Sequence, residues 1–301
     1  MRITVEEIKR VVLAEDDFGH ELRVGAILAN AKPKRIFGGG IQMTAPVPVQ
    51  LQTPEYGGTY SDPASKKTAQ FDYRCRLFKS CPGNLGSRHI LMAVECKSLD
   101  SGMPLLVCGR RRTADESFHD FIQVTEKKTV QRVSAGSSFY KQDGFVGKNV
   151  IRIKANDSEH NHSNKHAACR EGESEIYAKW SRALASARDM AYGSLYGQVN
   201  DPLPPDSVAF VMPIVVLPDG ALWKAEYDAE GKLAGDPAHV TRCEYYVGHR
   251  LDFSPTVFLT HIHFMTLAGL SETMEDLLSF ETTWTSTFSP QAKPSPHSQQ
   301  P

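Results

Sequence analysis

Two acidic side chains and one lysine lie at the ends of two neighbouring apolar segments, and their types suit hydrolytic chemistry. Glu95 and Lys97 close the run HILMAVECK, and Asp72 lies near the start of the alternating segment QFDYRCRLFKS. Side chains at positions i and i+2 of a strand point to the same face, so Glu95 and Lys97 should stand side by side. Whether Asp72 joins them depends on how the two segments pair.

The pairing of these segments can be predicted from the turn between them. The sequence Pro82-Gly83-Asn84 is typical of a turn and predicts a β-hairpin. Residues that face each other in a hairpin have numbers with a constant sum, here about 166 to 168 if this turn is the centre. Asp72 and Glu95 add up to 167, so we expect them to lie opposite each other. A slip of the register by about two residues is left open.

Two carboxylates that face each other across strands repel, and a cation between them would remove the conflict. Mg²⁺ needs few carboxylate ligands and keeps open positions for water and for a phosphate oxygen. Such an ion polarises a phosphodiester and lowers the pKa of bound water. Lys97 could then position or deprotonate the attacking water, or stabilise the charge of the transition state. The plain alternative is a solvated Glu/Lys pair at the end of an ordinary strand.

This arrangement resembles the PD-(D/E)xK, or restriction-endonuclease-like, nuclease superfamily. Asp72 matches the first acid of its motif, and Glu95 and Lys97 match the E-x-K that closes the next strand. Glu21, in the segment DFGHELRVGAIL, resembles the extra acid that many members carry on their first helix. The resemblance implies an α-β-β-β-α-β core, Mg²⁺ or Mn²⁺ as the cofactor, Asp72 and Glu95 as metal ligands with Glu21 in support, and hydrolysis of phosphodiester bonds.

Other groups with metal-ligand chemistry are present but lack a framework. The pair His261 and His263 shares one face of an expected strand, yet the acidic residue that such a site needs is missing nearby, so a structural role is favoured. A polar segment contains further candidate zinc ligands without the usual paired spacing: His160, His162, His166 and Cys169. The chain has no Walker motif and no nucleophile elbow.

The elements that must position Asp72 and Glu95 are helices and strands in mixed order. Apolar residues at helical spacing predict a helix that starts at Asp17, with Phe18, Leu22, Ala26 and Ala29 inward, and a long helix over 174–197. A further helix is expected over 114–124, and apolar strands are expected after 207. These elements predict an α/β (α+β) fold, with a mixed sheet flanked by helices on both sides. The resemblance makes it a restriction-endonuclease-like core.

Charge is distributed unevenly along the chain. Residues 1–170 contain 26 Lys and Arg against 18 Asp and Glu, whereas residues 171–301 contain 8 against 17. A basic half suits a polyanionic partner, although clusters of this size are also common on solvated surfaces. We expect DNA as the partner, with RNA left open, and contacts to the phosphate backbone from Arg110, Arg111, Arg112, Lys127, Lys128 and Arg132.

Length and composition complete the prediction. No run approaches the roughly 18 apolar residues of a membrane span, and the six scattered cysteines suggest reduced thiols, so we expect a cytoplasmic protein without membrane contact. One domain is expected over 1–284, with core segments 15–125 and 175–280, a mobile loop over 155–174 and a disordered tail over 285–301. A homodimer is left open. The predicted function is a nuclease of restriction, repair or mobile-element defence; the alternative is an inactive nuclease fold that binds nucleic acid or a protein.

Overall fold

The computed structural model describes residues 5–6, 17–32, 48–61, 67–81, 86–99, 104–127, 130–136, 139–153, 173–196, 202–254, 257–279 and 281–288. Its helices are α2 (Asp17–Asn30), α3 (Glu173–Tyr196), α4 (Leu267–Ser279), α5 (Glu281–Phe288) and the short 3₁₀ helix η2 (Asp115–Ser117). Its strands are β1 (Gln50–Leu51), β2 (Glu55–Tyr56), β3 (Thr59–Ser61), β4 (Thr68–Gln70), β5 (Tyr73–Ser80), β6 (Ser87–Cys96), β7 (Leu105–Arg111), β8 (Phe118–Val124), β9 (Val130–Gly136), β10 (Phe145–Arg152), β11 (Ser207–Leu217), β12 (Leu222–Glu226), β13 (Ala238–His239), β14 (Arg242–Ser254) and β15 (Val257–Thr266).

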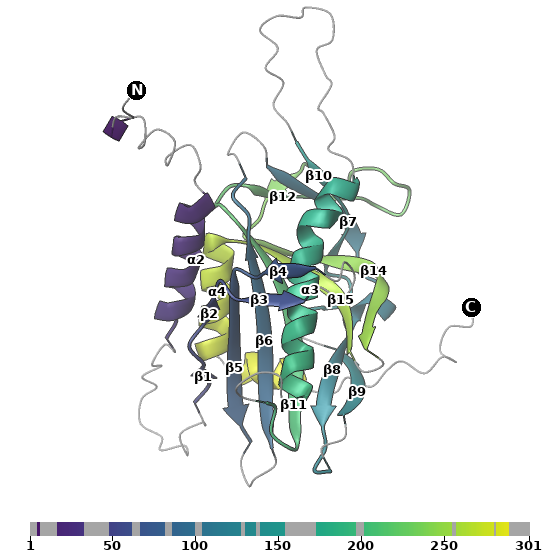
Figure 1. Cartoon of the computed structure of the whole chain (residues 1–301). Helices are drawn as coiled ribbons and strands as arrows, with labels where there is room; N and C mark the ends of the chain where they lie inside the picture. The colour runs from purple at the N-terminus through teal and green to yellow at the C-terminus, as the bar shows by residue number, and fades with distance from the viewer. Residues whose placement is uncertain are drawn as a thin grey trace, which may run out of the picture.

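Most of the strands join one large mixed sheet. Its main path runs β1-β5-β6-β11-β15-β14-β10-β7-β12-β13, and β2, β8 and β9 attach beside this path. The hairpin of β5 and β6 is antiparallel, whereas β11 runs parallel to both β6 and β15. Parallel neighbours need a crossover connection, and α3 precedes β11 in the chain and covers the sheet beside it (Figure 1). The two halves of the chain therefore meet in the centre of one sheet.

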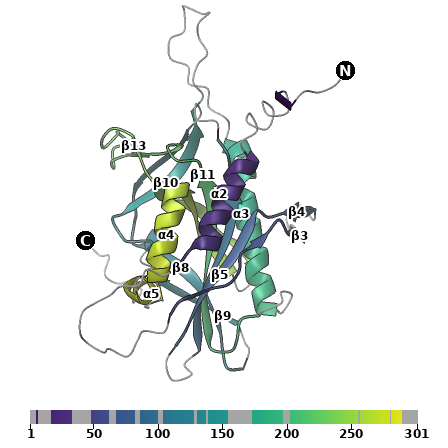
Figure 2. The same cartoon turned by 90° about the vertical axis from the view of Figure 1, so that its left-hand side faces the viewer.

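Helices cover both faces of this sheet. On one face, the α3 residues Trp180, Ala183 and Leu184 pack against alternate side chains of β6 and β11. On the other face, α2, α4 and α5 pack over the remaining side chains of the same strands (Figure 2). Central strands buried on both faces consist of nearly continuous apolar residues, as β11 does from Ala209 to Leu217. The predicted α/β class, with a mixed sheet between helices, is confirmed.

Two details of the predicted helices are wrong. Residues 118–124 form β8 rather than a helix, because Phe118, Phe121 and Ile122 are buried together with the polar side chains between them. In α2 the inward face consists of His20, Val24 and Leu28, whereas Phe18 and Leu22 are 62% and 54% exposed. The spacing of i and i+4 fits either stripe of α2, so it could not choose the buried one.

The predicted ends of the domain also change. Helix α5 continues to Phe288, so the first four residues of the expected tail are helical, and residues 289–301 lie outside the described part of the chain. Helix α3 begins at Glu173, so it includes the last two residues of the segment 155–174, and the rest of that segment is not described. The four candidate zinc ligands of that segment therefore lie outside the described residues.

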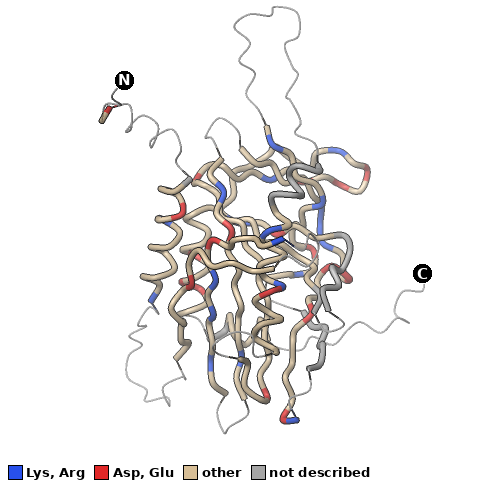
Figure 3. Tube along the Cα trace, viewed as in Figure 1, with Lys and Arg blue, Asp and Glu red and all other residues tan. Residues whose placement is uncertain are grey.

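Charge is less segregated in space than along the chain. Lys and Arg are interspersed with Asp and Glu over the body of the described structure (Figure 3). The two halves share one sheet, so acidic residues of the second half pair with basic residues of the first, as Glu244 does with Arg112. In the described residues, no helix is both long and apolar enough to cross a membrane.

Candidate functional site at the ends of β5 and β6

The antiparallel hairpin of β5 and β6 brings Asp72 and Glu95 to the same end of the sheet. The ladder pairs Tyr73 with Val94 and continues without a shift to Ser80 and Ser87. Each of these pairs adds up to 167, so the predicted register is confirmed, and Asp72 lies at the position that faces Glu95. The sequence therefore located these two acids correctly with respect to each other.

Glu95 is a buried carboxylate held by Lys97. The Lys97 Nζ atom lies 2.6 Å from the Glu95 Oε1 atom, with side-chain exposures of 24% and 3%. Burial raises the pKa of Glu95, and the nearby Asp72 carboxylate raises it further, whereas Lys97 and Arg182 act to lower it. The two strand residues share a face as expected, and Arg182 of α3 contributes a second positive charge to that face. Neither composition nor spacing pointed to Arg182.

Asp72 lies just before β5, and its side chain binds the backbone at the end of β6. Its Oδ2 atom accepts a hydrogen bond of 2.6 Å from the backbone N–H of Cys96. The backbone C=O of Asp72 accepts a hydrogen bond from the N–H of Gly57, which ties the start of β5 to the neighbouring turn. The carboxylate is thus oriented by the strand that carries Glu95, and its negative charge acts on Glu95 directly.

Glu21 is linked to this end of the sheet by hydrogen bonds from two tyrosines, but α2 covers the face opposite to Glu95, and Glu21 does not form a group of three acids with Asp72 and Glu95. The Tyr56 hydroxyl donates to the Glu21 Oε2 atom at 3.3 Å, and the Tyr73 hydroxyl donates to the Glu21 backbone C=O at 2.9 Å. The pKa of Tyr73 is raised to about 12, first by burial and then by the negative groups around it, which include Glu21 and Asp72. Sequence reasoning missed both tyrosines, whose only signal was their aromatic type beside an expected acid.

The carboxylate oxygens at this end of the sheet suit a hard cation, but only a few of them are available as ligands. Asp72 and Glu95 provide carboxylate oxygens, which Mg²⁺ and Mn²⁺ prefer, and the burial of Glu95 beside a second carboxylate favours added positive charge. Among the described residues, no three His, Cys, Asp or Glu side chains are grouped closely enough to hold a metal ion. The site therefore fits an ion held by two carboxylates and water, a common arrangement for Mg²⁺.

The residues predicted to contact nucleic acid are in different environments. Arg111 and Lys127 are exposed, and Arg110 is partly exposed and bound to the buried Glu116 carboxylate at 2.9 Å. Arg112 is only 2% exposed and is enclosed by the protein, so it is not available to a phosphate backbone on the surface. Two of the predicted residues cannot be placed fully, because Lys128 is outside the described residues and only the backbone of Arg132, in β9, is described.

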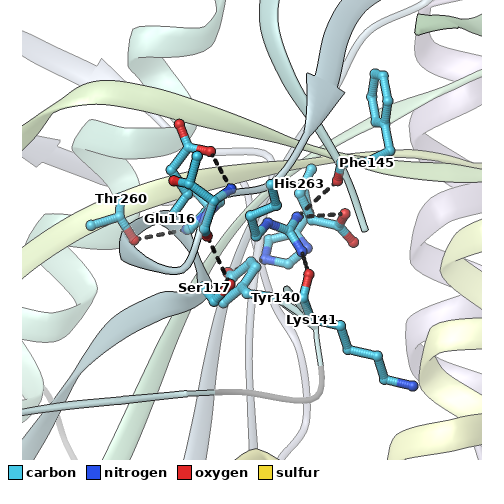
Figure 4. Close-up of polar contacts among 11 residues, drawn as sticks. Glu116, Ser117, Tyr140, Lys141, Phe145, Thr260 and His263 are labelled. Carbon is cyan, nitrogen blue, oxygen red and sulfur yellow. Dashed lines mark hydrogen bonds and ion pairs between the residues drawn. The ribbon is translucent and has the colours of Figure 1, made fainter. Parts of the chain in front are cut away.

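Arg112 instead belongs to a buried polar cluster that the sequence did not predict. Figure 4 shows the neighbouring residues Tyr140, Lys141, Phe145 and His263 of this cluster. The Arg112 guanidinium donates to the backbone C=O groups of Lys141 and Phe145, both at 3.0 Å, and pairs with Glu244 at 3.3 Å. Beside it, the Tyr140 hydroxyl lies 2.7 Å from His263 Nε2. Glu244 follows Arg112 by more than a hundred residues, and only the fold shows that they meet.

The histidines of this cluster are core residues. His261 and His263 are at most 1% exposed, and burial together with nearby positive charge lowers the pKa of His263 to about 3. The pKa of His261 is also lowered, first by burial and then by His119 and Arg112. Both imidazoles are therefore neutral at physiological pH, which agrees with the structural role favoured for this pair.

Comparisons with known proteins give no relative. No protein-family model matches the chain, and neither a curated protein nor a solved structure matches it significantly. The chemistry of the side chains described above is therefore the basis for any functional assignment.

Proposed function

We propose that this chain is a metal-dependent nuclease that hydrolyses phosphodiester bonds in DNA, in a setting of restriction, repair or mobile-element defence. The observation that carries the proposal is the meeting of Asp72 with the Glu95–Lys97 ion pair at one end of the β5–β6 hairpin. Two carboxylates can hold a metal ion that assists phosphodiester hydrolysis, and a nearby amine can stabilise the charge of the transition state.

The order of elements supports the finer, restriction-endonuclease-like assignment. A helix, α2, precedes the antiparallel strands β5 and β6, and the long helix α3 precedes β11, which lies parallel to β6. With the four strands β7 to β10 inserted between β6 and α3, this order resembles the α-β-β-β-α-β core of the PD-(D/E)xK superfamily. In that core the acids stand where Asp72 and Glu95 stand here.

Each residue of the site has a role in the proposed reaction. Asp72 and Glu95 would hold Mg²⁺ or Mn²⁺, and the bound ion supplies Lewis-acid polarisation of the phosphodiester and a more acidic water. Lys97, 2.6 Å from Glu95, orients that carboxylate and provides positive charge where the transition state becomes more negative. Glu21 lies on the helix that covers the face opposite to Glu95, where it binds the Tyr56 hydroxyl, and it is not assigned as a ligand of the ion. The exposed Arg111 and Lys127 are candidates for contacts with the DNA backbone.

Cleavage assays with matched variants test this function. Purified protein is incubated with supercoiled plasmid, single-stranded DNA and RNA, in Mg²⁺, in Mn²⁺ and in EDTA. We expect metal-dependent cleavage by the wild type and a loss of at least about 100-fold in Glu95→Gln and Asp72→Asn, because each removes a charged ligand. Glu230→Gln, an exposed acid in a distant turn, is the matched control and should cut normally. Equal cleavage by wild type and both site variants would refute the catalytic assignment.

A second function is favoured by one specific observation. Lys97 already neutralises Glu95, and no group of three ligating side chains occurs in the described part of the chain. A nuclease fold with such a site could bind DNA without cutting it. DNA binding that persists in EDTA, weakens steeply with salt and leads to no cleavage in either metal would favour this binding function over catalysis.

A further inference from the structure

A pocket separate from the Asp72–Glu95 site lies beside α4 and α5, at the strands β10, β12 and β14. It has a volume of about 550 Å³, and residues of β10, β12, β14, α4 and α5 line it. In the order of the sheet, β14 is three strands away from β6, or about 14 Å at the usual spacing of strands. None of Asp72, Glu95, Lys97 and Arg182 is among the residues that line the pocket. Its chemistry can therefore be considered independently of the proposed nuclease site.

The lining of this pocket has an excess of positive charge. Four cationic residues, Arg112, Lys141, Lys224 and Arg242, face two acids, Glu244 and Asp276. Each acid is engaged by an arginine, with 3.3 Å between Arg112 and Glu244 and 3.4 Å between Arg242 and Asp276. Neither Lys141 nor Lys224 has an ion-pair partner within the described residues. Among the described residues, the pocket thus offers two lysines that are not engaged by an acid.

Hydrogen bonds to the backbone hold the guanidinium of Arg112 in place at the pocket. Arg112, 2% exposed, donates to the C=O groups of Lys141 and Phe145 and so ties the segment that carries Lys141 to the wall of the pocket. Its Nε atom is buried and has no hydrogen-bond partner among the described residues. An anion close to this guanidinium would give it a further partner, because buried donors are normally satisfied.

The pocket also has apolar surfaces. Phe139, Phe145 and Val240 contribute to its lining, and the Lys224 Nζ atom lies 5.3 Å from the centroid of the Phe145 ring. The hydroxyl-bearing residues Thr283 and Ser286 of α5 complete the wall. Small-molecule sites typically combine such apolar walls with a few polar groups in a volume of about 300–1,000 Å³.

We propose that this pocket binds a small phosphorylated molecule of mononucleotide size. Lys141, Lys224 and Arg242 would hold the phosphate, and the aromatic rings would contact an attached ring or other apolar group. Phosphate suits the site better than a single carboxylate, because its double charge matches the two lysines that have no ion-pair partner among the described residues. A DNA duplex is a different kind of ligand, which would bind across an extended surface rather than inside a pocket.

Isothermal titration calorimetry of the full chain in EDTA tests the proposal without any dependence on nuclease activity. The probes are AMP, GMP, CMP and UMP, with orthophosphate and adenosine to separate recognition of the phosphate from recognition of the ring. We expect at least one mononucleotide to bind, adenosine to bind at least about tenfold more weakly, and Lys224→Gln and Lys141→Gln each to weaken binding about tenfold. Lys232→Gln, an exposed lysine in the turn between β12 and β13 that does not line the pocket, should bind as the wild type does.

Three results would overturn the proposal: no heat from any mononucleotide, unchanged affinity in both pocket variants, or binding of duplex DNA alone with the same loss in these variants. Thermal unfolding of each variant shows whether the fold is retained. If Lys224→Gln were misfolded, Lys141→Gln, whose side chain is exposed, would still decide the question. A chain that binds no mononucleotide could still cleave DNA, and a chain that does not cleave DNA could still bind a mononucleotide. The two results therefore test the two proposals separately.

Discussion

Replacing Lys97 by methionine tests how the structure controls the charge of Glu95. The change removes the ammonium group 2.6 Å from the Glu95 carboxylate, which is 3% exposed, and keeps a side chain of similar length. Loss of one partner from a fully buried ion pair costs about 3–5 kcal/mol, because a charge is left uncompensated. Lys97 is 24% exposed, so water can partly replace it, and we expect a loss of about 2 kcal/mol at pH 7.

The dependence of this loss on pH identifies its cause. The pKa of Glu95 is already raised from the ordinary value of 4.5 by burial, and removal of Lys97 should raise it further. A carboxyl group that holds its proton more tightly in the folded state favours folding at low pH and opposes it as the pH rises above the unfolded value. The difference in unfolding free energy between wild type and Lys97→Met should therefore be large at pH 7–8 and shrink towards pH 4.5.

Urea denaturation at several pH values, followed by circular dichroism, measures this difference. The double variant with Glu95→Gln should show no such pH dependence relative to Glu95→Gln alone, because no carboxylate remains to be left unpaired. Lys232→Met is the control for loss of an exposed lysine and should change stability by less than about 0.5 kcal/mol. A loss in Lys97→Met that is the same at pH 5 and pH 8 would refute this electrostatic explanation.

Three further changes test contacts that hold the sheet and its neighbouring segments together, each by urea denaturation. Arg112→Met should cost about 3–5 kcal/mol, because it leaves a carboxylate buried without its arginine, whereas the exposed Arg111→Met should cost less than about 0.5 kcal/mol; similar values for both would contradict the buried cluster. Gly86→Ala should destabilise by at least about 1 kcal/mol, since φ is +82° and the new Cβ would lie 1.8 Å from the Asp206 carbonyl oxygen; a neutral result would show that this contact is not as close. Arg74→Met should cost about 2–4 kcal/mol, because this arginine joins β5 to α3 through three hydrogen bonds, and a smaller loss at pH 7 would indicate that the contact contributes little.

The β5–β6 hairpin was predictable because its determinants are local. Alternation along residues 71–77 and the turn residues after Cys81 fixed the strands, and the constant sum of paired positions placed Asp72 opposite Glu95. The long helix α3 was likewise predictable from the period of Trp180, Leu184 and later apolar residues. In the β5–β6 hairpin and in α3, the spacing of apolar residues was consistent with only one type of secondary structure.

Other features depend on contacts between distant parts of the chain. The run from Phe118 to Val124 carries apolar residues at helical spacing, but its polar residues are buried by other strands, so it forms β8. Arg112 looked like part of a basic surface cluster until the fold brought it to Glu244. The positive charge of Arg182, which acts to lower the pKa of Glu95, comes from a helix nearly ninety residues later, and no local pattern indicates this interaction.

Uptake of a divalent ion by the Asp72–Glu95 pair is the most direct test of the proposed function. Calorimetric titration of the full chain with Mn²⁺ and Mg²⁺ should show one ion bound by the wild type, with binding lost in Asp72→Asn and Glu95→Gln and retained in Glu230→Gln. A wild-type chain that binds neither ion, or site variants that bind as well as the wild type, would contradict the account.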